Sequence, residues 1–351
     1  MVKRDAMARK NMDGIDCFKL IAAILIVFLH AVETSEVCGA GLQYVFTRFC
    51  VPFFFICSGY FFARGSAAAS DSKEYFFRYE KRLLGLFLFY GVLLSAPVVI
   101  SGYLKNYSDA SPLKLFLLII RRLLVAGHGA YWYLIALIIS TAFLYFVGAR
   151  SEKLLVSAIA AGLILQIGYT SFGGIIAEIP AWSKLNDLFY LVFSWESNFI
   201  MYGIPFCGIG WLIAKREIIL SRAVAWSGFV ICTAIRIFEF ALPYVSAGFW
   251  QGNAFSVAFI PQSVMFFFMA YHCKGAPAYS RRLRQLSTFI YLAHWPLLYN
   301  IVDPVLLLLG VDIYTTAAVP LKAFLTLAVC VCMNWGIKKV DNKYIQFLIG
   351  S

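Results

Sequence analysis

The first apolar stretch of the sequence contains two ionisable residues at a spacing that suits chemistry, and a third follows them. Lys19 and His30 are eleven residues apart, and eleven steps along an α-helix end within roughly 20° of the starting direction. Both side chains would share one face, separated by about 16 Å along the axis. Glu33 follows on the same side, where a carboxylate could hold the imidazole in one tautomer. The pattern predicts His30 as a catalytic base with Glu33 as its orienter; a snorkelling lysine and an interfacial histidine would give the same spacing.

Other ionisable residues also lie in apolar sequence, where hydrocarbon makes them costly unless they face a cavity or one another. Arg48 opens an apolar run and either lines a polar cavity or binds a lipid phosphate. Arg236 and Glu239, three residues apart, either neutralise each other or line a substrate path. His294 precedes Pro296, which frees a backbone carbonyl and suggests a kink beside a polar site. The predicted substrate-binding residues are Lys19, Arg48, Arg236, Glu239 and His294.

The elements that must position these residues are membrane-spanning helices. Of the 351 residues, 62% are hydrophobic and only 14% are charged, whereas a soluble domain is about half apolar and about a quarter charged. The apolar runs recur evenly, and most are long enough to cross about 30 Å of hydrocarbon. They predict an all-α polytopic membrane protein with about ten transmembrane helices, at residues 15–32, 42–63, 83–102, 131–149, 154–170, 199–214, 223–242, 255–272, 286–309 and 316–335.

The distribution of charge predicts how these helices are oriented. The net charge of +12 does not form a nucleic-acid-binding stripe, because Lys and Arg lie in the short gaps between apolar runs. With the N-terminus inside, most of the 30 Lys and Arg residues fall in inner loops, as cytoplasmic loops require. We expect an inner (plasma) membrane protein with a cytoplasmic N-terminus at 1–14, a single ten-helix domain at 15–337 and a cytoplasmic tail at 338–351. The apolar segment 113–125 is too short to cross the membrane, and it predicts an interfacial or re-entrant helix on the outer side.

Several sequence motifs together resemble the membrane-bound acyltransferase family 3. The similar segments follow one another in order along the chain: Gly14–Lys19 with His30, Arg48 with Val51–Phe55 and Ser58–Tyr60, Arg78–Leu83, Tyr131–Leu134, and Phe289–His294. The resemblance implies that family's ten-helix bundle. Lys19 stands where the family has arginine, and so lacks the planar guanidinium fork. The family's later histidine is displaced to His128, and Ser197 replaces an expected arginine.

Within that family, the chain is most similar to the membrane half of the VanT-type serine racemases of vancomycin-resistance clusters. The similar segments are Gly14–Phe18, Val51–Phe55, Ser197–Phe199 and Gly203–Phe206. The resemblance implies a domain that binds L-serine in a polar cavity and delivers it to a cytoplasmic racemase domain, which we expect beyond the C-terminus. The substrate carboxylate would pair with Arg48 or Lys19, and its ammonium with Glu33 or Glu239.

The same family resemblance implies an alternative function, that of a membrane O-acyltransferase. Such an enzyme would move an acyl group from acyl-CoA to an envelope hydroxyl, with His30 removing the hydroxyl proton and Lys19, Arg78 and Arg82 holding the phosphates. Acyl-CoA is then a co-substrate, while pyridoxal phosphate belongs only to the expected racemase domain. No metal-ligand, glycine-rich phosphate-loop or nucleophile-elbow motif occurs, so no metal or cofactor is predicted in this chain.

The predicted partners follow from these hypotheses. They are the lipid bilayer, L-serine or another small hydroxyl substrate, and a cytoplasmic racemase domain, with no nucleic acid; an oligomer is compatible with the sequence. A third interpretation, a non-catalytic assembly protein, also stays open, so the sequence does not decide whether the chain is itself an enzyme.

Overall fold

The computed structural model describes residues 13–32, 41, 45–171, 179–193, 197–247, 257–274, 277–340, 342 and 347. Within these ranges the regular structure is all helical, as predicted. The chain divides into two compact units, one made of Met1–Phe54, Ile219–Gln251 and Ala258–Ser351, and the other of Phe55–Ile218 and Gly252–Val257. We call them the terminal unit and the central unit and describe each by itself; the division falls within α4 (Cys50–Ala68).

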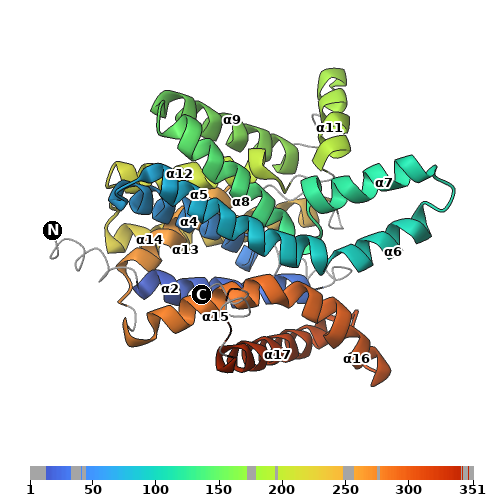
Figure 1. The fold of residues 1–351 in the computed structure, drawn as a ribbon. Coiled ribbons are helices and arrows are strands. Elements are labelled where there is room, and N and C mark those ends of the chain that lie inside the picture. Colours follow the sequence, from blue (N-terminus) through green and yellow to red (C-terminus); the bar gives the residue numbers. More distant parts are fainter. Residues whose placement is uncertain are drawn as a thin grey trace. The chain divides into compact units, whose positions relative to one another are not determined.

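The terminal unit is built around α2, which packs against α14, α15 and α17 (Figure 1). Near the proline at position 296 the long α15 helix changes to π-helical geometry, and α16 then continues it without a gap. The helical segments of this unit are α2 (Asp13–Ala31), α13 (Arg222–Ala247), α14 (Phe259–His272), α15 (Pro277–Leu297), the π-helical η6 (Leu298–Val302), α16 (Asp303–Leu308), the 3-10 turn η7 (Thr316–Ala318) and α17 (Val319–Lys339).

Contacts at both ends of α2 fix its direction relative to α15. Asp16 near the start of α2 contacts Ser280 near the start of α15, and the ends of the two helices meet at His30 and His294. The two helices are therefore parallel. Since α17 follows α16 after a short loop and packs back against η6 and α15, it runs in the opposite direction. We call the end that holds the starts of α2 and α15 and the end of α17 the proximal end, and the opposite one the distal end.

Gly14 sets the position of α2 along its neighbours. A Cβ at this residue would lie 2.2 Å from the carbonyl oxygen of Cys273 and 2.4 Å from that of Ala270. Those distances leave room only for glycine. The first turn of α2 thus rests directly on the last carbonyls of α14, which determines the level at which Lys19 and His30 lie.

The central unit packs α8, α9 and α12 together, with α5 against α8 (Figure 1). Its helical segments are the second part of α4, α5 (Ser72–Leu86), η1 (Phe87–Leu93), α6 (Ala96–Asn106), α7 (Pro112–Arg121), η2 (Arg122–Ala126), η3 (Gly129–Tyr131), α8 (Trp132–Phe143), η4 (Leu144–Gly148), α9 (Glu152–Ser171), α11 (Pro180–Phe193), η5 (Phe199–Gly203) and α12 (Ile204–Lys215). Two glycines bring α4 and α12 into backbone contact: a Cβ at Gly59 would lie 1.9 Å from the Cys207 oxygen, and one at Gly210 would lie 2.0 Å from the Ile56 oxygen. Small residues at a crossing are characteristic of helix pairs in membranes.

Among the described residues, five helical segments are long and apolar enough to cross a membrane: Asp13–Ala31, Gly129–Gly148, Glu152–Ser171, Arg222–Ala241 and Thr316–Lys339. A sixth arises if Ser72–Leu93 and Ala96–Asn106, bent by 42°, form one span. Each of the ten predicted spans overlaps a described helical segment, but the count of ten stays a prediction. The predicted interfacial segment 113–125 is helical as α7 and η2, and α7 has no fully buried residue.

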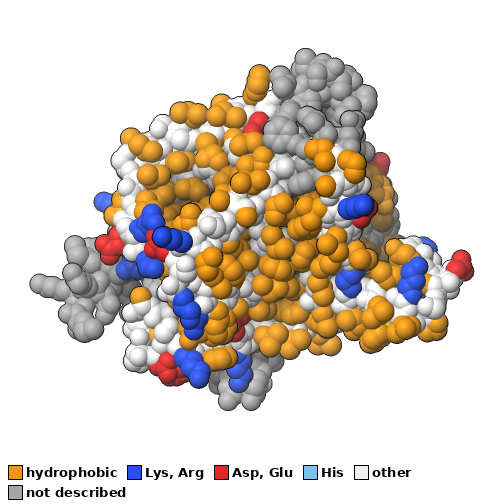
Figure 2. All heavy atoms as spheres, turned by 90° about the horizontal axis from the view of Figure 1, so that it is seen from above, with side chains coloured by type: hydrophobic (Ala, Val, Ile, Leu, Met, Phe, Trp, Pro, Cys, Tyr) orange, Lys and Arg blue, Asp and Glu red, His pale blue; other side chains and the backbone are white. Residues whose placement is uncertain are grey.

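Apolar side chains on the outside of the helices suit a hydrocarbon environment. Phe238 on α13 is 63% exposed, and on α17 Phe324 is 67% exposed. Figure 2 shows one face of the molecule, on which a broad hydrophobic area is interrupted by few charged side chains. In water such a surface would cost about 25 cal/mol for each Å², whereas lipid chains cover it without that cost.

Candidate functional site

The polar residues of the terminal unit lie at two levels along α2. At the proximal end, Asp16 is buried; Ser280 donates a hydrogen bond to its Oδ2, and Arg284 Nη1 lies 4.0 Å from the same oxygen. His30 lies fourteen residues further, which is about 21 Å along the helix. The proximal contacts hold the starts of α2 and α15 together, and the distal end holds the predicted histidines.

His30 and His294 lie side by side at the distal end, with ring centroids 5.1 Å apart. The sequence predicted both as site residues, one catalytic and one substrate-binding, and their helices bring them together. His294 is completely buried, whereas the side chain of His30 is partly exposed. The two imidazoles therefore form a polar centre at the distal end of the terminal unit.

The backbone fixes the tautomer of His294. Its Nδ1 lies 2.8 Å from the Tyr291 carbonyl oxygen and 3.0 Å from that of Ile290. Carbonyl oxygens only accept hydrogen bonds, so Nδ1 carries the proton and Nε2 of the neutral ring carries a lone pair. Nε2 is buried and has no hydrogen-bond partner among the described residues. His294 Nε2 is therefore a buried hydrogen-bond acceptor next to His30, and it can accept a hydrogen bond from a hydroxyl or an ammonium group of a ligand.

The π-helical segment η6 extends this centre. Pro296 lies within the last turns of α15, and η6 begins two residues later. Tyr299 on η6 donates a hydrogen bond of 3.0 Å from its hydroxyl to the carbonyl oxygen of His30. Proline removes a helical hydrogen bond, and π-helical turns occur often at functional sites. Through Tyr299 this segment anchors the end of α2; the kink at Pro296 stays a prediction.

A buried ion pair lies next to Tyr299 along the chain. Asp303 is the first residue of α16, and its Oδ1 lies 3.3 Å from Nζ of Lys322 on α17. Lys322 is completely buried and Asp303 is 5% exposed. None of Tyr299, Asp303 and Lys322 was predicted from the sequence as a site residue. The available signal was a pair of opposite charges near the adjoining ends of two consecutive predicted spans. We call His30, His294, Tyr299, Asp303 and Lys322 the distal cluster.

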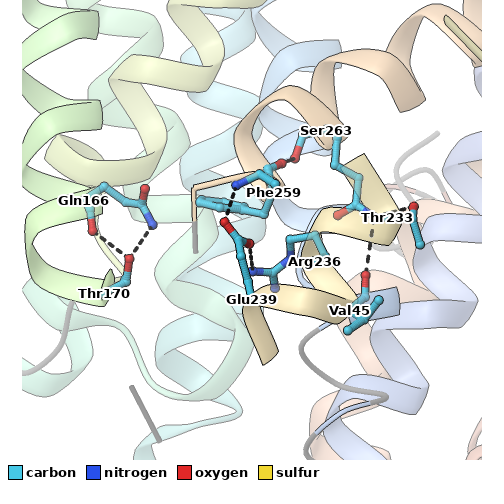
Figure 3. A network of polar contacts seen from close by, with 10 residues as sticks. Val45, Gln166, Thr170, Thr233, Arg236, Glu239, Phe259 and Ser263 are labelled. Atoms are coloured by element: carbon cyan, nitrogen blue, oxygen red, sulfur yellow. Dashed lines mark hydrogen bonds and ion pairs between the residues drawn. The ribbon is translucent and has the colours of Figure 1, made fainter. Parts of the chain in front are cut away.

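Arg236 and Glu239, also predicted as site residues, form a separate buried pair on α13 (Figure 3). Arg236 Nη1 donates to Glu239 Oε2 at 3.2 Å, and the N–H of Ala258 donates to Oε1 at 3.1 Å. Both carboxylate oxygens are thus engaged within the protein. This arrangement favours the first of the two interpretations, an internal ion pair that ties α13 to the start of α14, over a substrate-lining one.

Of the remaining predicted residues of the terminal unit, Lys19 and Arg48 belong to the described residues and Glu33 does not. Lys19 is partly buried in the first half of α2. Arg48 lies in the turn that precedes α4, whose first residue is Cys50. Glu33, predicted to orient His30, falls outside the described residues. The structure therefore brings the predicted site residues His30 and His294 together; the roles of Lys19, Arg48 and Glu33 stay predictions.

The central unit carries Arg78 and Arg82, two of the three basic residues predicted to hold an acyl donor; the third, Lys19, belongs to the terminal unit. Arg78 and Arg82 are exposed on α5. An open surface hollow of about 530 Å³ is lined by Lys73, Phe77 and Arg78, together with Asp71, Glu74 and Lys81. Arg78 also contacts Glu74 at 3.6 Å. The hollow offers cations and one exposed aromatic ring to an anionic group, with two carboxylates opposing them.

His128, which lies two residues before the position where the resembled family has a histidine, belongs to the central unit and precedes η3. Burial, reinforced by the nearby Arg122 guanidinium, lowers the pKa of this imidazole to about 4. It is thus neutral at physiological pH. Within the part of the chain that the structure covers, no group of three or more His, Cys, Asp or Glu side chains could hold a metal ion.

Comparison with known proteins gives a family and three relatives. A family profile described as an acyltransferase domain matches residues 12–335. An "Amino-acid racemase" from Enterococcus faecalis is 28% identical over 207 residues, or 56% of this chain and 28% of the relative. A "Serine/alanine racemase" from Enterococcus gallinarum is 28% identical over 211 residues, or 58% of this chain and 29% of the relative. A second amino-acid racemase from E. faecalis is 26% identical over 212 residues. The match thus spans under a third of each relative's length, and no solved structure is significantly similar.

Proposed function

This chain belongs to the acyltransferase family 3, and we propose that it is the membrane domain of a racemase-type protein, which binds L-serine and delivers it to a cytoplasmic racemase domain. Its multi-pass membrane character agrees with its apolar helices. The names of the relatives point to amino-acid chemistry. The observation that carries the proposal is the pair of touching imidazoles, His30 and His294, at the distal end of the terminal unit.

The distal cluster offers the right chemistry for serine. The Nε2 atom of His294 accepts a hydrogen bond from the serine hydroxyl or ammonium, since its Nδ1 proton is already donated to the backbone. His30, partly exposed beside it, gives the second polar contact and the side from which the ligand enters. A small polar side chain is favoured, because the surrounding bundle is apolar and closely packed.

The arrangement of helices supports a direction for delivery. The start of α2 and the end of α17 share the proximal end, where Lys338 and Lys339 close α17. Lysines at helix ends face the cytoplasm in the positive-inside pattern. We therefore place the proximal end and both termini in the cytoplasm of an inner-membrane protein. Serine binds at the distal, outer end and leaves at the proximal end, near the racemase domain.

Equilibrium binding of radiolabelled L-serine to the purified chain in detergent tests this proposal. We expect saturable binding that is lost in His30→Ala and that excess unlabelled L-serine displaces. Saturable binding that is unchanged in His30→Ala would show that the imidazole pair is not the site, and no saturable binding at all would refute the proposal.

A second candidate, membrane O-acyltransfer from acyl-CoA to an envelope hydroxyl, is favoured by a separate observation. The hollow of about 530 Å³ on α5 presents Lys73, Arg78 and Lys81, and cations grip phosphates by charge-assisted hydrogen bonds. In that case His30 takes the acceptor's hydroxyl proton. Release of CoA from acetyl-CoA, lost in His30→Ala and weakened in Arg78→Ala, would support this function in place of serine delivery.

A further inference from the structure

The Asp303–Lys322 pair is expensive to bury. Removing two charges from water costs several kcal/mol for each ion, and attraction offsets this only when further hydrogen bonds satisfy the remaining groups. The Lys322 ammonium has three N–H donors. It is completely buried, yet Nζ makes the 3.3 Å ion pair and no hydrogen bond to any described residue. An ammonium in this state has capacity to bind an additional anionic group.

In a second buried ion pair of the terminal unit, Arg236–Glu239, both carboxylate oxygens are bound by groups of the protein. Arg236 donates a hydrogen bond to Glu239, and a backbone N–H binds the second carboxylate oxygen. These two residues are three apart on one helix, so the pair forms wherever that helix forms. Asp303 and Lys322 come from different helices, and a relative movement of α16 and α17 would open the space between them.

The pair is also continuous with the histidine centre. Tyr299, bonded to the His30 carbonyl, precedes Asp303 by four residues in the uninterrupted segment of η6 and α16. Side chains four residues apart lie on one side of a helix, about 6 Å from each other. An ion pair and an imidazole pair are thus connected through one tyrosine at the distal end. Leu298, Val302 and Leu306 form an apolar cluster on the same segment.

We propose that Asp303 and Lys322 are the charged anchors of the amino-acid site, with Lys322 binding the α-carboxylate and Asp303 the α-ammonium. The inference rests on the proposed function and names the ligand class, a zwitterionic α-amino acid. Without ligand, the two side chains neutralise each other. A zwitterion brings one charge of each sign, so it separates the pair without leaving either partner unneutralised.

If a ligand replaces each partner of the Asp303–Lys322 pair, the ligand must carry both a positive and a negative charge. A compound with only one of the two charges leaves one buried side chain without a counter-charge, which is heavily penalised. Glycerate, which lacks the ammonium, and L-serine methyl ester, which lacks the carboxylate, should therefore bind far more weakly than L-serine. The histidine centre then distinguishes amino acids by their side chains, and the ion pair recognises the part that they share.

The test compares L-serine binding by the full chain and by the double variant Asp303→Asn, Lys322→Met. Removing both charges together leaves no uncompensated charge, so the variant is expected to fold. We expect its affinity for L-serine to fall by about a hundredfold or more, because two charge-assisted contacts are lost. The matched control is Cys330→Ala, at another fully buried position two turns further along α17, which should bind as the wild type does.

The outcomes separate this inference from the proposed function. Binding by the wild type with loss in the double variant supports both, while equal binding by the two proteins overturns the anchor assignment and leaves serine binding in place. No binding by the wild type overturns both. If the double variant aggregates, competition in the wild type decides: glycerate and the methyl ester should compete at least about tenfold more weakly than unlabelled L-serine, and equal competition overturns the inference.

Discussion

At the residue scale, the chemistry of the distal end depends on where single protons lie. His294 donates its one N–H to the carbonyls of Tyr291 and Ile290, which leaves Nε2 as an acceptor in the neutral ring. His30 was predictable as its partner only in part. The eleven-residue spacing gave the shared face of Lys19 and His30, but it held no information about which residue of a distant helix would meet the imidazole.

Replacing His294 by Phe tests the acceptor role. Phenylalanine keeps a ring in the same buried position but has no lone pair, so a hydrogen bond to the ligand is lost. We expect L-serine affinity to fall by about tenfold, measured by equilibrium binding. The control is His272→Phe, at the end of α14 and outside the distal cluster, which should bind normally. An unchanged affinity in His294→Phe would contradict the assigned role.

A second residue-scale prediction concerns acid stability. The pKa of His128 is lowered to about 4 in the folded protein by burial and by Arg122, whereas an unfolded histidine titrates near 6.5. Below about pH 6.5 the unfolded chain therefore binds a proton that the folded one does not, and stability declines as pH falls toward 4. The thermal midpoint in detergent should drop less between pH 7 and 5 in His128→Gln than in the wild type. Parallel declines would contradict the assignment.

The two buried ion pairs of the terminal unit differ in how far they could be predicted from the sequence. Arg236 and Glu239 were predictable as a pair, because three residues of one helix separate them. Asp303 and Lys322 are opposite charges near the adjoining ends of two consecutive predicted spans, but whether they meet depends on how α16 and α17 pack. Periodicity predicts which face a residue occupies on its own helix, while its partner depends on how helices pack.

At the element scale, helix contacts in the central unit depend on glycines. At Gly59 and Gly210 the backbones of α4 and α12 touch, so any Cβ must push the helices apart. Helices were predictable from the apolar runs, since each of the ten predicted spans overlaps a described helix. The π-helical segments were not, because a single extra residue in a turn leaves no compositional signal.

Enlarging one of these glycines tests the packing. Gly210→Val places carbon atoms against the backbone of Ile56 and should destabilise the protein by about 1–3 kcal/mol, seen as a lower thermal midpoint in detergent. Gly102→Ala on α6 is the matched control, because a Cβ there meets nothing within 4 Å; it should be neutral or slightly stabilising. Equal effects of both substitutions would contradict a backbone contact between α4 and α12.

At the scale of the whole molecule, polar groups lie at successive positions along α2, which is consistent with a path for serine across the membrane. The Asp16 contacts lie at the proximal end, the distal cluster lies at the other, and Lys19 lies between them along α2. The predicted topology runs α2 and α15 in the same direction across the membrane, as the structure shows, while the side on which they begin stays a prediction from the loop charges.

Reporter fusions at Ser351 test that orientation. Green fluorescent protein folds in the cytoplasm, and alkaline phosphatase is active only outside it, where its disulfides form. We expect a fluorescent fusion with the first reporter and an inactive one with the second. The opposite result would place the proximal end outside and reverse the direction of delivery.

Uptake of radiolabelled L-serine into liposomes that contain the purified chain tests the central claim most directly. The account predicts uptake above that of protein-free liposomes, saturable with L-serine concentration and abolished in His30→Ala. Uptake equal to that of protein-free liposomes, in a preparation that keeps its native thermal midpoint, would contradict the claim that this membrane domain delivers serine.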